Sequence, residues 1–368
     1  MEADLPDARR GTHRRVTIRQ VAREAGVAVG TASLALADNP VVAAGTKERV
    51  RAVAARLEYR PSALGRALRA QRTNAVGLIV PHSSEHVFTH LYFMEILEGV
   101  SEVLSAAGMT LVLSTTPSEA DEEEAYAKIL HSQLVDGLIL ASAALHDKNI
   151  ARLQLSPYPF VFIGRYPLNS DVPAIGIEDE AGARLAVEHL LAHGHTRIAH
   201  ISGPLAHLSA ADRRDGYLHA LEAAGIGARP EYCWEGDYSE GAGLAGTRAL
   251  LALPEPPTAL FAANDETAVG VYEALREVGR EPGPAFPVVA FDDVRVARLM
   301  NPQLTTVRQP MRQLGRAATE LLLALLSGQP VAQRQTELPT ALVVRASCGC
   351  AGPRAPGEEV IPTPAILP

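Results

Sequence analysis

The chain has 368 residues, of which 47% are hydrophobic, 21% charged and 5% aromatic, and this balance excludes collagen, coiled coil and wholesale disorder. No apolar run approaches the ~20 residues of a membrane-spanning helix, and the first residues lack the apolar core of a secretory signal. Three cysteines exclude a disulfide scaffold and are typical of a reducing cytosol. We therefore expect a cytoplasmic protein with no membrane partner.

The net charge of −8 conceals a strong asymmetry along the chain. Residues 9–72 contain 14 Arg and Lys against 4 Asp and Glu, so they carry +10 and the remainder carries −18. A basic head on an acidic body predicts a polyanion-binding module joined to a domain with another task. The alternative is a solvated basic tail, but the helical patterning inside the head argues against it.

Three short helical patterns fill the basic head. The first places apolar residues on one helical face at Ile18, Val21, Ala22 and Ala25. Thr17 and Gln20 form a capping box before it, and Gly26 can end it in a left-handed conformation. Two more apolar patterns follow at Val29, Ala32 and Leu36, and at Val50, Val53, Ala54 and Leu57. Two short helices joined by a glycine turn and covered by a third predict a helix-turn-helix over 16–60, with generic three-helix packing as the alternative.

A short basic segment follows the three helices. Pro61 is well placed to begin a helix, and arginines then flank small and apolar residues up to Arg72. A helix this short is marginal alone and would form only on a partner. An apolar wedge between arginines suits the minor groove of DNA, so we expect a hinge helix and linker over 61–73. Residues 1–15 are expected to be a flexible basic extension.

The acidic body alternates strand-like apolar runs with helical patterns. The runs cover 76–80, 110–114, 137–141, 160–164, 174–178, 197–202, 259–264 and 287–292. Helical stretches that end in glycine lie between many of them, for example over 94–108 and 178–194. This alternation predicts parallel sheets covered by helices on both faces, with ligands bound beyond the carboxyl ends of the strands.

Polar residues follow several of these runs, which favours a ligand cleft at the strand ends. They are His82, Ser83, Ser84, Arg165, Glu178, Asp179, Asn264, Asp265, Asp292 and Asp293. Each of them could instead be a helix N-cap, and Asp179 and Asp265 are good candidates for that role.

The segments VTIRQVAREAGVAVGTASLALADNP and YRPSALGRALR closely resemble the LacI family of bacterial transcription regulators. The resemblance continues through VGLIVP, VDGLIL, EHLLAHGHTRIAHISGP, FAANDETAVG, VVAFDD, LTTVRQP and LPTALVVRAS, and covers roughly residues 16–347. It implies an α/β protein: a three-helix DNA-binding domain, a hinge helix, and a two-lobed periplasmic-binding-protein-like domain with two doubly wound parallel sheets.

The resemblance also implies domain boundaries. The effector-binding and dimerisation domain would cover 74–352, with one lobe over about 74–173 and 304–337. The other lobe would cover about 174–303 and 338–352, and the proline-rich tail 353–368 would be disordered.

Site residues follow from the same resemblance. In the DNA-binding part, Thr17 would contact phosphate, Leu68 would wedge into the central minor-groove step beside Arg66, and the second helix would present Val29, Gly30, Thr31 and Ser33. Leu34 stands where the family usually has arginine, so it offers a thymine methyl an apolar contact in place of a bidentate bond to guanine. The resemblance implies that Phe88, Arg213, Asn264 and Asp292 bind the effector. Their positions after strand-like runs add His82 and Arg165 to the predicted effector site.

Other motifs are better explained without a cofactor or a metal. GAGLAG at 241–246 fits a dinucleotide fingerprint, but it follows EGDYSE instead of a strand, and Ser239 looks like a helix cap. The group His82, Glu85, His86 and His90 is spaced as a metal face, yet Pro81 places His82 in a loop, which favours pocket-lining histidines. The turn His193-Gly-His195 is interpreted as structural, and Cys348 and Cys350, with Cys233 remote, make no standard zinc quartet.

No catalytic motif is present, so we expect a non-enzyme. The sequence predicts a homodimeric repressor that binds a pseudopalindromic double-stranded operator and responds to a small molecule, most simply a sugar. A nucleobase or small acid is an open alternative for the ligand, and the direction of the response is open too. The tail lacks leucine heptads, which favours a dimer over a tetramer. The alternatives of another class are a transporter's solute-binding protein and a sugar-modifying enzyme.

Overall fold

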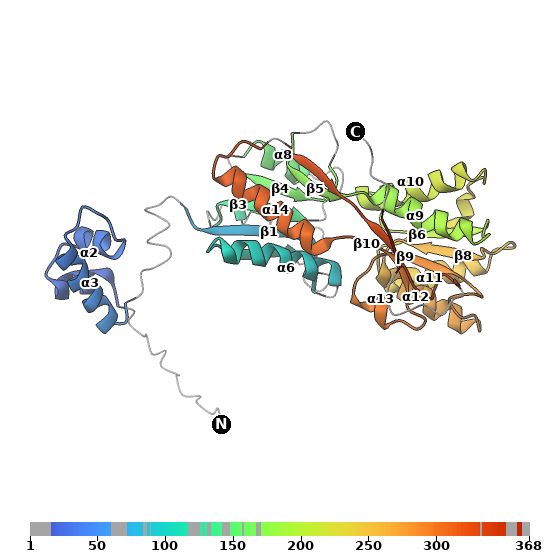
Figure 1. Cartoon of the computed structure of the whole chain (residues 1–368), viewed down its shortest axis with the longest axis horizontal. Coiled ribbons are helices and arrows are strands. Elements are labelled where there is room, and N and C mark those ends of the chain that lie inside the picture. Colours follow the sequence, from blue (N-terminus) through green and yellow to red (C-terminus); the bar gives the residue numbers. More distant parts are fainter. Residues whose placement is uncertain are drawn as a thin grey trace, which may run out of the picture. The chain divides into compact units, whose positions relative to one another are not determined.

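The computed structural model describes residues 16–59, 72–83, 87–88, 90–116, 126–127, 129–130, 134–141, 148–156, 158–166, 171–331, 333–350 and 359–362. The chain divides into two compact units, residues 1–73 and residues 74–368, which are considered one at a time (Figure 1). The expected extension over 1–15, most of the expected hinge and most of the tail lie outside the described residues.

The first unit is a three-helix domain. Its helices are α1 (Ile18–Ala25), α2 (Val29–Leu36) and α3 (Ala44–Arg56). The backbone N–H of Thr17 donates to Oε1 of Gln20 at 2.8 Å, and Gly26 ends α1 with φ at 65°. A small core of alanines and valines, with Val21 and Val50 fully buried, lies between the three helices. The three helical patterns of the sequence are confirmed.

The second unit begins with a parallel sheet. Its strands are β1 (Ala75–Ser83), β2 (Thr110–Thr116), β3 (Gly137–Ala141), β4 (Phe160–Ile163), β5 (Ala174–Ile177) and β11 (Gln335–Leu338), in the order β11-β5-β4-β3-β1-β2. Two helices, α6 (Leu91–Ala106) and α14 (Met311–Leu326), pack together over one face, and α8 (Lys148–Gln154) contributes to the core on the other face (Figure 1). The central strands β3, β4 and β5 are buried on both faces, which explains why they are apolar throughout, whereas the edge strand β11 is mostly polar.

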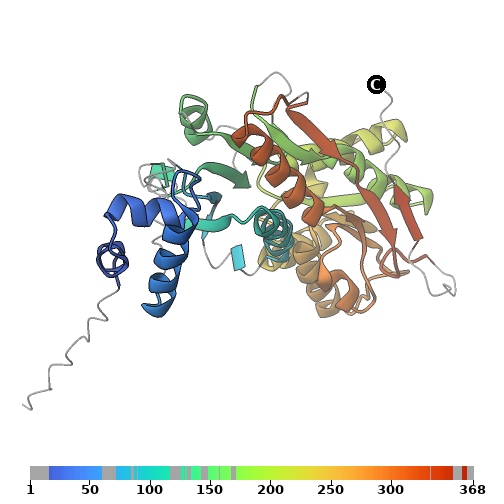
Figure 2. The same cartoon turned by 60° about the vertical axis from the view of Figure 1, so that its left-hand side comes forward.

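A second sheet of seven strands forms the C-terminal lobe. Its strands are β6 (Ile198–Ser202), β7 (Cys233–Glu235), β8 (Ala259–Ala262), β9 (Val288–Asp292), β10 (Thr305–Arg308), β12 (Ala341–Val344) and β13 (Glu359–Pro362), in the order β13-β12-β10-β9-β8-β6-β7. Helices α9 (Asp179–Ala192) and α10 (Leu208–Ala223) cover one face, and α11 (Glu240–Leu251) and α12 (Asp265–Glu277) cover the other (Figure 2). The short helices η2 (Pro230–Tyr232) and α13 (Arg295–Leu299) complete it.

The chain passes between the lobes later than the sequence predicted. β5 pairs with β4 and β11 in the first sheet, and β10 pairs with β9 and β12 in the second. The crossings therefore come after β5, after β10, and between β11 and β12. The expected crossings near 173 and 303 put β5 and β10 in the wrong lobes, because a short apolar strand carries no mark of the sheet it joins.

Two further expectations need correction. Residues 359–362 of the supposedly disordered tail form β13, which pairs antiparallel with β12. Its Val-Ile pair suits a strand, and Pro362 is tolerated because β13 is at the sheet edge. His82, expected in a loop, lies within β1, which continues to Ser83 across an irregularity in its pairing with β2.

Close helix packing explains the glycine-rich segment GAGLAG. It lies inside α11, where Ser239 caps the helix by accepting from the N–H of Ala242 at 3.1 Å. A Cβ on Gly243 would meet the Thr267 carbonyl oxygen of α12 at 2.0 Å, and one on Gly270 would meet the Glu240 carbonyl oxygen at 1.9 Å. The glycines therefore let α11 and α12 touch backbone to backbone. Among the described helices, none is long and apolar enough to cross a membrane.

Candidate DNA-binding surface and effector site

Helix α2 presents an unusually apolar outer surface. Val29 is 43% exposed and Leu34 is 39% exposed, with exposed Gly30 and half-buried Thr31 beside them. Helix α2 contains no charged residue. Four of the residues predicted to face DNA from α2 therefore do lie at least partly on its surface, and the contacts they can offer are methyl groups and one hydroxyl.

Ser33 does not lie on that surface. It is only 8% exposed and, like Ala32 and Ala35, belongs to the buried side of α2. The predicted role of Ser33 in reading DNA is thus poorly supported. Thr17, in contrast, is exposed at the start of α1. The predicted Arg66 and Leu68 lie outside the described residues.

Much of the positive charge on the three helices is already paired. Asp38 binds Lys47 at 3.0 Å and Arg51 at 2.7 Å, and the hydrogen bond from Lys47 leads in lowering the pKa of Asp38. Arg56 binds Glu24 at 2.5 Å. By comparison, Arg19 and Arg23 on α1 are exposed and have no ion-pair partner within the described part of the chain. These two arginines are the natural groups for phosphate.

In the second unit, Arg213 of α10 lies at the centre of a buried polar cluster. Its Nε donates to Oδ1 of Asp179 at 2.8 Å, and its Nη1 donates to the carbonyl oxygen of Ala263 at 2.7 Å. Nη1 also lies 3.5 Å from Oδ1 of Asp292, and the guanidinium carbon stacks 3.8 Å above the ring of Phe291. The three charged side chains are each at most 5% exposed. These contacts through Nε, Nη1 and the guanidinium plane hold Arg213 in one orientation.

Burial dominates the electrostatics of this cluster. It raises the pKa of Asp179, and it raises the pKa of Asp292 to about 7, with Arg213 opposing both shifts. Burial alone would lower the pKa of Arg213, but the two carboxylates outweigh it and raise that pKa. Arg213 thus stays charged, while burial favours the neutral form of Asp292.

The backbone at the end of β9 is strained at the same place. Asp292 has φ at 115° and Asp293 has φ at 61°, which are values that residues with a side chain rarely adopt. The side-chain amide of Gln309 donates to Oδ1 of Asp292 at 2.5 Å. Gln309 follows β10, where the chain leaves this lobe, so it links the cluster to a lobe crossing.

Asn264 is the cap of α12, and Asp265 is not. The side-chain oxygen of Asn264 accepts from the N–H of Thr267 at 2.9 Å, while its amide donates to the Tyr238 carbonyl oxygen and to Glu266. Asp265 instead accepts from Thr306 at 2.6 Å and from the N–H of Val294 at 2.8 Å. A helix cap does lie at this turn, as the sequence analysis allowed, but the cap is Asn264, which was predicted to bind the effector, and not Asp265. Asp179 is likewise not the cap of α9, where Glu178 precedes the first turn.

Arg165 joins the two lobes. It follows β4 in the first sheet, and it makes a bidentate ion pair with Asp212 of α10 at 2.6 and 2.5 Å. That hydrogen bond leads in raising the pKa of Arg165. Asp212 is next to Arg213 in the sequence, so the lobe-to-lobe contact and the buried arginine share one helical turn.

Sequence reasoning missed several members of this region. Tyr92 of α6 lies close enough to Asp292 and Asp179 for their charges, after burial, to raise its pKa. Burial also raises the pKa of Tyr238, which packs closely over Gly203. Neither tyrosine follows a predicted strand, which was the signal used.

Phe88, the predicted aromatic, is 58% exposed and makes no ring contact with the described residues. The side chain of His82 is outside the described set.

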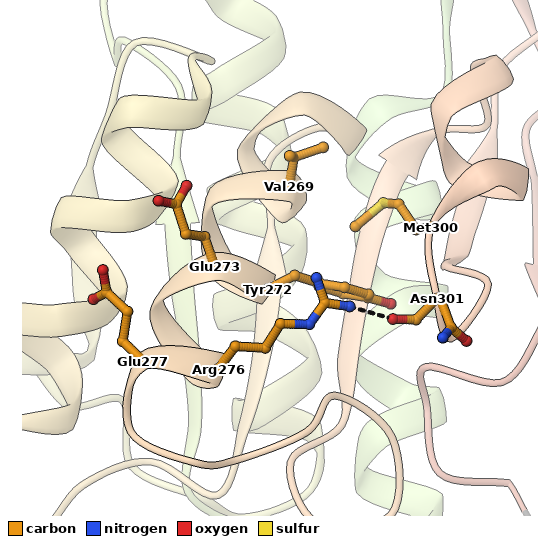
Figure 3. A pocket seen from close by; sticks show the side chains of 7 residues that line it. All are labelled: Val269, Tyr272, Glu273, Arg276, Glu277, Met300 and Asn301. Carbon is orange, nitrogen blue, oxygen red and sulfur yellow. Dashed lines mark hydrogen bonds between the residues drawn. The ribbon is translucent and has the colours of Figure 1, made fainter.

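A surface pocket of 430 Å³ lies elsewhere on the C-terminal lobe (Figure 3). It is lined by Val269, Tyr272, Glu273, Arg276, Glu277, Met300 and Asn301, and Arg276 donates across it to the Asn301 carbonyl oxygen. It contains none of the predicted effector residues. We did not predict a site at Cys348 and Cys350, yet Sγ of Cys350 lies 3.4 Å from His189 in α9 and 2.9 Å from His193, the residue directly after that helix.

Comparison with known proteins agrees with this arrangement. Residues 17–62 match the family described as bacterial regulatory proteins, lacI family, and residues 187–348 match a periplasmic binding protein-like domain. The chain is 32% identical over 333 residues to catabolite control protein A of Priestia megaterium, covering 90% of this chain and 99% of the relative. It is 32% identical over 332 residues to the ribose operon repressor of Escherichia coli K12, with coverage of 90% and 99%.

Solved structures of bacterial transcription regulators are also similar to this chain. The lac repressor dimer bound to operator and the anti-inducer ONPF is similar with a TM-score of 0.79 and 30% identity, over 92% of this chain and 100% of that one. The complex of the regulator CelR with cellobiose has a TM-score of 0.71 and 32% identity, over 90% and 100%.

A helix-turn-helix domain followed by a two-lobed binding domain defines a ligand-regulated DNA-binding protein. The chain belongs to the LacI family of bacterial transcription regulators. The alternative of a transporter's solute-binding protein is not favoured, because it accounts for the second unit alone.

Proposed function

We propose that this chain is a homodimeric transcriptional repressor whose affinity for a pseudopalindromic operator is set by a sugar or sugar derivative. The ligand binds between the lobes, at the cluster of Arg213, Asp179 and Asp292. The observation that carries the proposal is the buried guanidinium of Arg213, held by two carboxylates one residue away from the lobe-bridging Asp212.

The chemistry of the cluster suits a polyhydroxylated ring. A guanidinium supplies donors in a fixed fork, carboxylates supply acceptors, and sugar hydroxyls can satisfy both. Tyr92 and Tyr238 lie near the same charges and offer aromatic faces and hydroxyls. Two relatives carry sugars in their names, the ribose operon repressor and the CelR–cellobiose complex, which supports this ligand class.

The site is placed to couple ligand binding to lobe geometry. A ligand that replaces bonds of Arg213 acts on the same helical turn that carries the Arg165–Asp212 ion pair. Ligand binding then favours one relative position of the lobes, provided the ligand binds the two positions with different affinity. We infer that this change reaches the operator through the hinge segments of a dimer.

On DNA, α2 enters the major groove with Val29 and Leu34 outermost. Their contacts with thymine methyl groups specify bases weakly, so phosphate contacts by Arg19 and Arg23 supply much of the affinity. The protein acts by binding, in the cytoplasm where the operator is, and performs no chemistry on its ligand.

A thermal-shift screen of the full-length protein tests the ligand class. Monosaccharides, disaccharides, sugar phosphates and nucleobases are each added to the protein at millimolar concentration, and the melting temperature is recorded. A ligand that binds the native state raises the melting temperature through mass action. At a ligand concentration of one hundred times Kd, the free energy of unfolding increases by ~2.7 kcal/mol. A sugar hit is expected. A hit among nucleobases alone would contradict the proposed ligand class while leaving the DNA-binding role intact.

A further inference from the structure

A cluster of cysteine and histidine side chains lies in the C-terminal lobe, apart from the Arg213 site. Cys350 Sγ is 2.9 Å from Nε2 of His193 and 3.4 Å from Nε2 of His189. All three donor atoms lie within 4.8 Å of one another. The two imidazole rings meet edge to face, with centroids 4.7 Å apart. Three soft or borderline ligands therefore point at one small volume.

A fourth donor is next to them. Sγ of Cys348 lies 2.6 Å from Sγ of Cys350, and Cys348 itself is only 1% exposed. Gly349 between them has φ at 75°, and a Cβ there would meet Cα of Pro284 at 2.9 Å. The left-handed turn that only glycine makes readily thus brings both sulfurs to the same side of the chain.

The fold builds this cluster from two distant segments. His189 lies in the last turn of α9 and His193 is the residue that ends the helix, so their four-residue spacing brings both rings to the same side. The cysteines follow β12, which pairs with β10 beneath α9. Asp179, which binds Arg213, is at the first turn of α9, about 15 Å of helix away from His189. The two sites therefore occupy opposite ends of the same helix.

We propose that His189, His193, Cys348 and Cys350 bind a single divalent zinc ion. Two thiolates and two neutral imidazoles form a Cys₂His₂ set, which is a common tetrahedral zinc set and neutralises the charge of the ion. Hard cations such as Mg²⁺ and Ca²⁺ are excluded, because the cluster offers them no oxygen ligand. Two thiolates on one tetrahedral zinc lie about 3.8 Å apart, so the sulfurs separate by roughly 1 Å when the ion enters.

The ion would attach the end of the chain to the C-terminal lobe. Residues after Cys350 lead to the edge strand β13, and the cysteines are held to α9 by the ion. Metal binding therefore stabilises the packing of α9 on β12, because the ion joins two segments that are otherwise in contact through side chains only. Sequence reasoning dismissed the site because it counted the cysteines alone and took His193 for a turn residue.

Cobalt and zinc titration of the full-length protein tests the proposal. The protein is first reduced and stripped of metal, and Co²⁺ is then added in an anaerobic cell. One equivalent is expected to produce the thiolate charge-transfer band and the intense visible bands of tetrahedral cobalt, and Zn²⁺ is expected to abolish both. Zinc is also expected to raise the melting temperature.

Two variants locate the ion. His193 is exposed, so His193→Gln should fold normally, and Cys350→Ser removes the central thiolate. Each should weaken zinc binding about tenfold or more, since even the loss of an outer-shell partner typically has that effect. Cys233→Ser and His219→Gln are matched controls that change a cysteine and a histidine elsewhere and should bind like the parent. Circular dichroism checks that all four are folded.

Three results would overturn the proposal. The first is the absence of stoichiometric cobalt or zinc binding by the reduced protein. The second is unchanged affinity in both His193→Gln and Cys350→Ser, which would place the ion at another cluster. The third is a Cys348–Cys350 disulfide that forms under mild oxidation and is not prevented by zinc, since a bound ion would protect both thiolates.

Discussion

At the scale of single residues, Arg213 is the group on which the proposed ligand response depends. Arg213→Ala removes the guanidinium, which leaves Asp179 buried without its ion-pair partner and Asp292 with the hydrogen bond from Gln309 alone. The expected destabilisation of the lobe is about 3–5 kcal/mol. Arg213→Lys retains the charge but not the bidentate geometry, so it is the milder variant. We expect both variants to lose the ligand-induced melting shift, while operator binding, measured by anisotropy, stays within twofold of the parent.

The matched control for that experiment is the neighbouring residue. Arg214 pairs with Asp215 on the surface of α10, so Arg214→Ala removes an arginine from the same helix without touching the buried cluster. It should keep the full ligand response. Equal loss of response in both variants, or loss of operator binding by a folded Arg213→Lys protein, would argue against the assigned role.

His200 predicts an acid-dependent loss of stability. It is fully buried between Tyr217 and Phe261, and burial lowers its pKa to about 4. In the unfolded chain His200 becomes protonated near pH 6.5, whereas in the folded protein it stays neutral until about pH 4. The contribution of neutral His200 to the free energy of unfolding is therefore fully present above pH 6.5 and is lost as the pH falls towards 4. The loss reaches ~3 kcal/mol when both states are protonated. Urea unfolding of the C-terminal lobe at several pH values measures it.

The comparison variant for this pH effect is His200→Phe, which keeps the ring stack. This variant loses the hydrogen bond to the Phe261 carbonyl oxygen, so its free energy of unfolding should be lower at pH 7. Between pH 6.5 and 5, that free energy should change less than in the parent protein. An unaltered slope in His200→Phe would assign the acid sensitivity to other groups.

At the scale of elements, the contact of α11 and α12 gives a sharp contrast between two glycines. Gly243→Ala places a methyl group against the Thr267 carbonyl oxygen, so the helices must separate, at a cost of ~1–3 kcal/mol. Gly241→Ala, in the same helix, meets only the Ser239 hydroxyl at 3.6 Å and should gain up to ~1 kcal/mol from helix propensity. In thermal unfolding, Gly241→Ala should have the highest melting temperature, the parent protein an intermediate one, and Gly243→Ala the lowest. Equal stability of both variants would mean that the two helices do not touch as described.

Element types were predictable because their apolar patterns are strong. All eight strand-like runs of the acidic body contain a strand, and the three helices of the basic head are present. The short strands β7 and β10 were not predicted as runs, since β7 is mostly exposed and β10 begins with two threonines. Membership of a lobe was predicted wrongly for β5 and β10, because pairing partners are chosen in three dimensions.

Strand ends predicted Arg165, Asn264 and Asp292 as members of the candidate site, whereas Arg213 lies within α10 and was predicted only from the resemblance to the LacI family. Arg213 does lie beside Asp292, and Arg165, which follows β4, pairs with Asp212, the residue before Arg213 in α10. Tyr92 and Tyr238 come from a helix and a loop with no such signal. The cysteine–histidine cluster joins residues more than 150 positions apart, so only the fold brings it together.

At the scale of the whole molecule, the basic head and acidic body predict salt-dependent DNA binding. A dimer that neutralises about six to ten phosphates should lose roughly 10³–10⁵ in affinity between about 50 and 200 mM salt. Arg23→Gln should reduce the slope of log affinity against log salt by about 1.8 per dimer, because one phosphate contact is lost from each chain. Arg56→Gln, whose parent arginine is paired with Glu24, is the control and should change the slope less. A flat salt dependence would contradict an electrostatic DNA interface.

The account as a whole requires that one chain bind operator and ligand and that each binding event alter the other. The decisive measurement is the Kd of the full-length protein for an operator duplex selected from random DNA, with and without the ligand found in the thermal screen. A coupling of about 1–3 kcal/mol is typical of allosteric proteins, so saturating ligand should change the operator Kd by about 5–150-fold. An increase would identify an inducer and a decrease a corepressor. An unchanged Kd at saturating ligand would contradict regulation of the DNA-binding unit by the Arg213 site.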